Sequence, residues 1–176
     1  MRITILCLIA SCSFFFNEAS AQKLVSVVDN TITVFTRDSP IGNTDVIEVS
    51  LPAKTQEFIY RISIFKKDQE KTGESLATLL DSIGAKSVSV TTDFRQLVLS
   101  NHDNTIASAF IFSNPADADN FYFKKTGWRA CKNLLRITSS CLSSRQCLGK
   151  KVYFGFSNGD INDEIDVRLE VVALAE

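Results

Sequence analysis

The C-terminal stretch, residues 151–176, alternates between apolar and polar side chains. One run of alternation covers residues 152–157 and a second covers residues 165–171. Strict alternation with a period of two is typical of an antiparallel strand that has one buried face and one wet face. Turn-forming residues at 158–160 separate the two runs. The pattern therefore predicts a β-hairpin whose apolar face packs on another sheet.

Similar runs of β-branched, aromatic and alternating residues predict further strands. These runs cover residues 24–28, 31–36, 46–51, 57–66, 88–99 and 106–112. The turn pair Asp29-Asn30 separates the first two. One segment changes to helical spacing and predicts a short helix around residues 75–83, with Gly84 as its C-terminal cap. Roughly eight to ten short strands and one helix indicate a mostly β fold, an antiparallel β-sandwich or jelly roll.

Residues 1–21 have the features of a secretory signal peptide. The segment starts with a positive charge, residues 3–10 are apolar, and small residues at 19–21 suit a signal peptidase. Cleavage there would leave residues 22–176 as a single β-sandwich domain, secreted or periplasmic. An alternative is a bacterial lipoprotein signal, in which Cys12 would carry a lipid and anchor the chain at the cell envelope.

The charge of the chain excludes some classes of partner. The formal net charge is −1, and lysine pairs such as Lys124-Lys125 are isolated. A near-neutral domain without a basic cluster argues against nucleic-acid binding. No segment after the signal region is long and apolar enough to span a membrane, so we expect no membrane span.

Cys131, Cys141 and Cys147 follow the predicted signal peptide. Export favours a disulfide, and these cysteines allow one bridge and one leftover thiol. A Cys141–Cys147 bridge would close the polar loop between them, and Cys131–Cys141 is the alternative pairing. The odd thiol could link two chains into a disulfide-bonded dimer, or it could lie buried like a small apolar residue. The spacing is unlike that of a zinc site.

An aromatic and basic cluster consists of Phe121, Tyr122, Phe123, Trp128 and Arg129. Exposed aromatic side chains with an arginine are typical of carbohydrate and protein recognition. Tyr122, Trp128 and Arg129 are therefore the candidate ligand-binding residues. In the alternative interpretation, period-two alternation turns about half of the aromatic side chains into the core.

The acidic loop between the last two runs supplies candidate metal ligands. Asp160, Asn162 and Asp163 could offer oxygen atoms to calcium, which often takes its ligands from loops. The spacing of an EF-hand is absent, so a solvated loop is the alternative interpretation. Calcium is the one cofactor that the sequence brings into consideration.

Candidate catalytic residues are few. His102 is the only histidine, and it lies in a turn-forming context with no nucleophile motif beside it. A single histidine in this setting disfavours triad hydrolases and most catalytic zinc sites. A pair of carboxylates could hydrolyse a glycosidic bond, but no acidic residue lies in an aromatic-rich motif that marks a cleft.

The C-terminal runs also resemble a known family. Residues 153–158, a short acidic loop and residues 165–171 resemble the closing strands of GOLD domains, and residues 52–60 resemble their extended second segment. GOLD domains are β-sandwich modules of secretory-pathway cargo proteins and lipid-binding proteins. The cargo-receptor members have a cysteine where this chain has Gly155. The resemblance implies an interaction module without catalysis.

Together these features predict an exported, non-enzymatic β-sandwich that binds a protein, a glycan or an envelope component. A calcium-dependent binding module and a glycan-active hydrolase are the two alternatives. A shallow, exposed aromatic face would support binding, whereas a deep pocket with convergent carboxylates would support hydrolysis.

Overall fold

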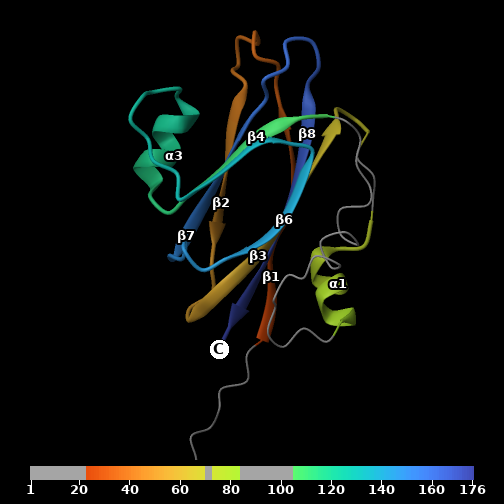
Figure 1. Ribbon diagram of the computed structural model, residues 1–176, viewed down its shortest axis with the longest axis vertical. Coiled ribbons are helices and arrows are strands. Elements are labelled where there is room, and N and C mark those ends of the chain that lie inside the picture. The colour runs from red at the N-terminus through yellow and green to blue at the C-terminus, as the bar shows by residue number, and fades with distance from the viewer. Residues whose placement is uncertain (1–22, 70–72, 84–104) are drawn as a thin grey trace, which may run out of the picture.

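The computed structural model describes residues 23–69, 73–83 and 105–176. This part of the chain is mostly strand, with two short helices on opposite sides of the strands (Figure 1). The elements in chain order are β1 (Lys23–Val34), β2 (Thr44–Ser50), β3 (Thr55–Lys66), α1 (Leu76–Ser82), β4 (Ala107–Phe112), α3 (Pro115–Tyr122), β5 (Lys132–Ile137), β6 (Ser139–Ser144), β7 (Lys151–Ser157) and β8 (Ile165–Ala175).

The strands form two four-stranded antiparallel sheets. Sheet A has the order β1-β8-β3-β6 and sheet B the order β2-β7-β4-β5. The pairings between the first and second halves of the chain are nested: β4 pairs with β5, β3 with β6, β2 with β7 and β1 with β8. Successive strands change sheet, except from β4 to β5. This arrangement is a jelly roll, and it confirms the predicted fold class.

The main core lies between the two sheets and is built from the alternating residues. Phe154 on β7 is fully buried, and its ring packs edge-on against Tyr60, with 5.5 Å between the ring centroids. Val167 and Leu169 on β8 are equally buried. Full burial of such a side chain stabilises the fold by about 1.5–3 kcal/mol. The period-two pattern therefore identified the inner face of these strands correctly.

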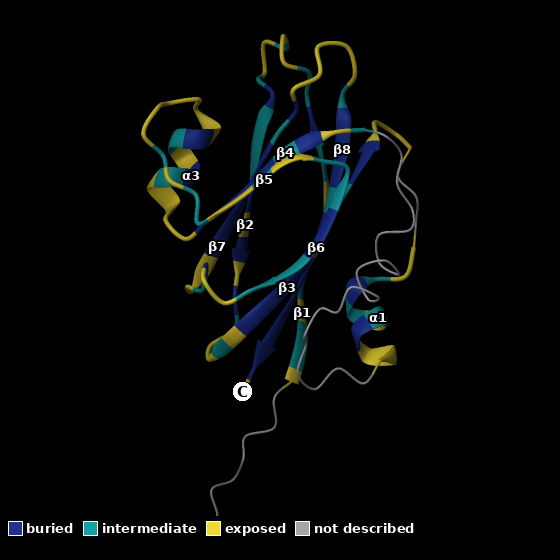
Figure 2. Cartoon of the chain, viewed as in Figure 1, coloured by how far each residue is buried: buried dark blue, intermediate teal, exposed yellow. Residues whose placement is uncertain are grey.

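Each helix covers the outer face of one sheet (Figure 2). Leu76 and Leu80 of α1 pack with Ile59 and Val172 on sheet A. On sheet B, Phe121 of α3 packs in a second small cluster with residues of β4 and β7. Neither helix is long enough to be stable alone, so this packing holds them in place. Helix α1 confirms the short helix that the sequence predicted around residues 75–83.

The predicted C-terminal hairpin is wrong. β7 belongs to sheet B and β8 to sheet A, so the two strands face each other across the core and do not pair. Alternation shows which face of a strand is buried, but it does not show which strand lies beside it. Asn158 fixes the connection: its backbone N–H donates to Asn43 O at 3.0 Å, and its side chain donates to Asp163 O at 2.8 Å.

The first two predicted strands are one strand, β1. The Asp29-Asn30 pair continues the ladder with β8, because Asp29 lies opposite Glu170 and Asn30 opposite Leu169. Both carboxylate oxygens of Asp29 accept hydrogen bonds from the Arg168 guanidinium, at 2.8 and 2.9 Å. An ion pair across the strands thus replaces the turn expected from local composition.

The outer face of β8 carries polar side chains that are largely buried, whereas the alternation predicted that this face is exposed to solvent. Glu170 is 2% exposed and accepts hydrogen bonds from the Arg61 Nε and from the backbone N–H of Leu76, the latter at 2.8 Å. Arg61 also donates from Nη2 to Glu74 O at 2.7 Å. This buried ion pair therefore ties the start of α1 to sheet A.

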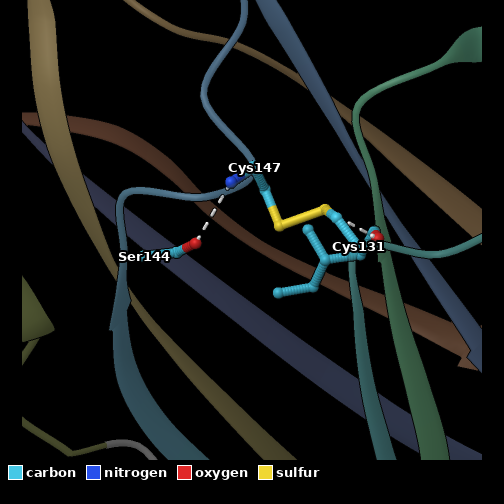
Figure 3. Close-up of a disulfide and its surroundings, with 4 residues drawn as sticks. Cys131, Ser144 and Cys147 are labelled. Atoms are coloured by element: carbon cyan, nitrogen blue, oxygen red, sulfur yellow. Dashed lines mark hydrogen bonds between the residues drawn. A yellow bond between two sulfur atoms is a disulfide. The ribbon is translucent and has the colours of Figure 1, made fainter.

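The disulfide joins Cys131 to Cys147, so both predicted pairings are wrong (Figure 3). Cys131 lies just before β5 at the edge of sheet B, and Cys147 lies after β6 at the edge of sheet A. The chain already crosses between the sheets from β5 to β6, and the disulfide joins the other ends of these edge strands. Cys141 lies outside the disulfide and is 1% exposed, which disfavours a covalent dimer through this thiol.

Several predictions lie outside the described residues: the signal peptide at residues 1–21 with its lipidation alternative at Cys12, the cap at Gly84, the strands at 88–99, and His102. Among the helices that the structure describes, none is long and apolar enough to cross a membrane.

Candidate functional site

The segment that carries the predicted binding residues begins with helix α3, which sequence analysis missed. The Asn114 side chain accepts a hydrogen bond from the backbone N–H of Ala116 at 3.0 Å, and Pro115 occupies the first helical turn. An asparagine cap followed by proline is a helix-start signal. An Asn-Pro pair is also typical of a strand end, so this signal alone does not identify a helix.

The inward side of α3 is an aromatic cluster that includes Trp128. The Trp128 ring packs edge-on against three phenylalanine rings. The distances between ring centroids are 5.1 Å to Phe110, 5.8 Å to Phe112 and 5.5 Å to Phe121. Edge-on aromatic pairs stabilise by about 0.5–1.5 kcal/mol beyond the burial of their area. Trp128 is therefore mainly a packing residue that fastens α3 to sheet B, and the alternative interpretation holds for it.

Tyr122 and Phe123, at the end of α3, point away from this cluster. They are 45% and 63% exposed, and their rings meet edge-on with centroids 5.1 Å apart and planes at 82°. The Lys125 ammonium lies 5.5 Å from the centre of the Phe123 ring, within the range of a cation–π interaction. We call Tyr122, Phe123 and Lys125 the aromatic corner.

The connection between β1 and β2, together with the first residue of β2, contacts the chain at the end of α3. Thr44 Oγ1 donates a hydrogen bond to Tyr122 O at 3.0 Å. Gly42 has a φ of +103°, which only glycine adopts readily, and a Cβ placed on it would lie 3.9 Å from Lys124 Cε. Ile41, beside Gly42, is 72% exposed. A second segment thus brings an exposed apolar side chain to the same part of the molecule.

Of the three predicted binding residues, the structure therefore turns Tyr122 outward and Trp128 inward. Arg129 is exposed, and its backbone N–H donates to Asp117 Oδ1 at 3.0 Å, which fixes the segment after α3 to the helix start. Sequence analysis did not select Lys125 or Ile41. The lysine lies next to the aromatic run, but no local pattern connects the Ile41 loop to it.

A cavity of about 670 Å³ lies at one end of the sandwich, where β3 and β5 end and β4 and β8 begin. Its lining includes Lys66, Gln69, Ile106, Arg136, Asp160 and Asp163. The volume is within the range of small-molecule sites, roughly 300–1,000 Å³. Two of the predicted calcium ligands, Asp160 and Asp163, thus line this cavity.

The carboxylates of that loop already have partners. Asp160 Oδ1 accepts hydrogen bonds from the backbone N–H groups of Asn162 at 2.8 Å and Asp163 at 3.3 Å. These two bonds are the main reason that the pKa of Asp160 is lowered from its ordinary value of 3.8. Asp163 Oδ2 lies 3.2 Å from Lys66 Nζ. The described residues contain no group of at least three His, Cys, Asp and Glu side chains placed to hold a metal ion.

This arrangement gives little support to the two alternative functions. A general acid in glycoside hydrolysis needs a raised pKa, and Asp160 has the opposite shift. Calcium takes six to eight oxygen ligands, and the Asp160 and Asp163 carboxylates are engaged by backbone N–H groups and a lysine.

Comparison with known proteins finds no family model that matches this chain and no curated protein with significant similarity to it. The resemblance of the last strands to GOLD domains therefore stays a prediction.

Proposed function

We propose that this protein is a non-enzymatic binding module that docks a partner protein through the aromatic corner. The observation that carries the proposal is the exposure of Tyr122 and Phe123 on a firmly held helix end. Exposed neighbouring aromatic side chains are common anchors of protein interfaces, because each buries a large area with little loss of conformational freedom.

The shape of the corner favours a protein over a flat glycan surface. The two rings stand at 82° to each other, so they do not form a flat platform on which a sugar ring could stack. Two exposed aromatic rings of this kind suit a pocket in a partner protein. Lys125 beside Phe123 adds a positive charge, which favours a pocket with an acidic rim.

The corner is also held rigidly enough to bind without large reorganisation. The inward ring cluster around Trp128 fixes α3 to sheet B, and the Thr44–Tyr122 hydrogen bond fixes the helix end. Binding groups on a rigid scaffold lose less conformational entropy on association.

Export of the module to a secreted or periplasmic location is part of the proposal. The Cys131–Cys147 disulfide supports it, since disulfides persist mainly in oxidising compartments. Anchoring through a lipid on Cys12 is the alternative form of the same proposal, and it would hold the module at the cell envelope.

Site-specific photocrosslinking in the native host tests the function. A benzophenone amino acid replaces Phe123 in one variant and Ile83, another exposed apolar residue at 52%, in the control. We expect a discrete protein adduct from position 123 alone, suppressed by excess unlabelled wild-type protein but not by Tyr122→Ala/Phe123→Ala. The same adduct from both positions, or none from position 123, would overturn the proposal.

A further inference from the structure

The sandwich-end cavity contains an arginine in an unusual conformation. On β5, Leu135 and Arg136 together lie opposite the single residue Ser108 of β4, since the register passes from Ala107↔Ile137 to Ala109↔Leu134. This is a β-bulge, a feature that re-aims side chains and is frequent beside functional sites. Arg136 has a φ of +54° there, in the left-handed region that glycine and asparagine prefer.

The Arg136 side chain is the one cavity cation whose charge is not used by a neighbour that the structure describes. Its backbone N–H donates to Ser108 Oγ at 3.4 Å, but no described residue forms a hydrogen bond or ion pair with its guanidinium. Lys66 is engaged with Asp163. Arg136 is exposed, so its guanidinium is open to a ligand, and backbone strain of this kind clusters at ligand-binding sites.

The other lining groups identify the class of that ligand. Arg136 and Gln69, which carry hydrogen-bond donors, line the same cavity as Asp160 and Asp163. The charges of Lys66, Arg136, Asp160 and Asp163 sum to zero, so the lining has no net charge that would favour an anion or a cation. The backbone N–H groups and Lys66 engage one oxygen of each carboxylate, so a neutral ligand dense in hydroxyl groups can donate to the other oxygens and accept from the arginine. Ile106, 41% exposed, offers an apolar contact for the C–H face of a sugar ring.

We infer that the cavity at the end of the sandwich binds a neutral saccharide unit, with the Arg136 guanidinium as its main hydrogen-bond donor. The site shares no residue with the aromatic corner, so it goes beyond the proposed function and does not depend on it. The aromatic corner and the cavity would serve two different ligands on one scaffold.

Arg136→Gly separates a binding role from a structural one. Glycine adopts the observed φ without strain, so this variant should keep or raise the melting temperature while it removes the guanidinium. Lys54→Gly is the matched control, because Lys54 also has a positive φ of 60° and lies at the opposite end of β3 from Lys66. A marked fall in melting temperature for Arg136→Gly would show a structural role and overturn the inference.

Titrations followed by the methyl NMR signals of isoleucine locate the binding. The probes are the methyl glycosides of glucose, galactose and mannose together with N-acetylglucosamine, and glucuronate and inorganic phosphate are the anionic comparators. We expect at least one neutral sugar to shift the signals of Ile106 and Ile165 but not of Ile83. Arg136→Gly should weaken its binding by about tenfold or more, the size expected for hydrogen bonds from a charged donor, and Lys54→Gly should not.

Three results of these titrations would contradict the inference. The first is that no neutral sugar shifts Ile106 or Ile165. The second is that only the anionic probes do so, which would show an anion site. The third is that Arg136→Gly binds the sugar as tightly as the wild-type protein does.

Discussion

Gly155, in the middle of β7, shows how closely α3 approaches sheet B. A Cβ at this position would lie 2.6 Å from Phe121 Cε1 and 2.9 Å from Phe112 Cε2, shorter than real Cβ atoms tolerate. The absence of a side chain therefore lets Phe121 lie directly on the strand.

Gly155→Ala should destabilise the fold, because the added methyl group displaces packed aromatic rings. Overpacking of this kind costs about 1–3 kcal/mol. Urea denaturation measures the loss in the free energy of unfolding. Gly159→Ala is the control, since nothing lies within 4 Å of a Cβ there, and it should change stability by less than about 0.5 kcal/mol. Equal stability of the two variants would show that α3 does not sit on Gly155.

Trp128→Ala and Tyr122→Ala should differ in stability, although both residues belong to one sequence cluster. Trp128 contacts three other rings, so its removal should cost about 2–3 kcal/mol, somewhat less than the 3–5 kcal/mol of a fully buried tryptophan. Tyr122 is 45% exposed, and its removal should cost less than about 1 kcal/mol. Thermal or urea unfolding of both variants measures the two losses in the free energy of unfolding. A fully stable Trp128→Ala protein would make Trp128 a surface anchor instead.

At the scale of elements, α1 depends on a buried ion pair as much as on its apolar residues. The helix spans only Leu76–Ser82, too short to persist without tertiary contacts. The Arg61–Glu170 pair contacts the backbone at the helix start on both the donor and the acceptor side, through Leu76 N–H and Glu74 O. Loss of the pair should therefore loosen the helix and not only the strands.

Glu170→Leu should destabilise the protein by about 3–5 kcal/mol, because it leaves the Arg61 charge buried without its partner. Hydrogen exchange of residues 76–82 should become faster in the same variant. Arg61→Leu/Glu170→Leu should recover part of the loss, since replacing both charges removes the unpaired ion. Unchanged exchange in α1, with stability within about 0.5 kcal/mol of wild type, would contradict this role.

Features that depend on residues within one element were predictable from the sequence, and features that depend on strand pairing were not. The inner faces of β3, β7 and β8 and the helix α1 were predictable, because periodicity and spacing lie within one element. Strand pairing was not: Asp29 reads as a turn residue until Arg168 is placed opposite it. The bulge at Arg136 was equally hidden, because it exists only in the register between β4 and β5.

At the scale of the whole molecule, the nested pairing of strands brings distant cysteines together. Cys131 and Cys147 are 16 residues apart, and they flank β5 and β6, which are edge strands of different sheets. A disulfide closing a loop of this size stabilises by about 3 kcal/mol in the chain-entropy model. Sequence spacing gave the wrong disulfide prediction, because Cys141 is nearer in sequence to each of these cysteines. In the fold, Cys141 instead packs in the cluster under α1.

Tryptic mapping without reduction should find residues 130–132 linked to residues 146–150. Each cysteine lies on its own tryptic peptide, because arginine and lysine residues separate them. Cys141, on the peptide 137–145, should react with iodoacetamide only after denaturation, since it is buried. A link between 137–145 and either of the other peptides would contradict the fold at this edge.

The central claim, that the aromatic corner is the binding surface, is tested most directly by the dissociation constant for the partner captured by crosslinking. We expect Phe123→Ala to weaken binding by about 30-fold, as the loss of an interface hot spot of about 2 kcal/mol requires. Ile83→Ala, with a similar loss of exposed apolar surface on the far side of the sandwich, should bind like the wild type. Wild-type affinity of Phe123→Ala would contradict the account.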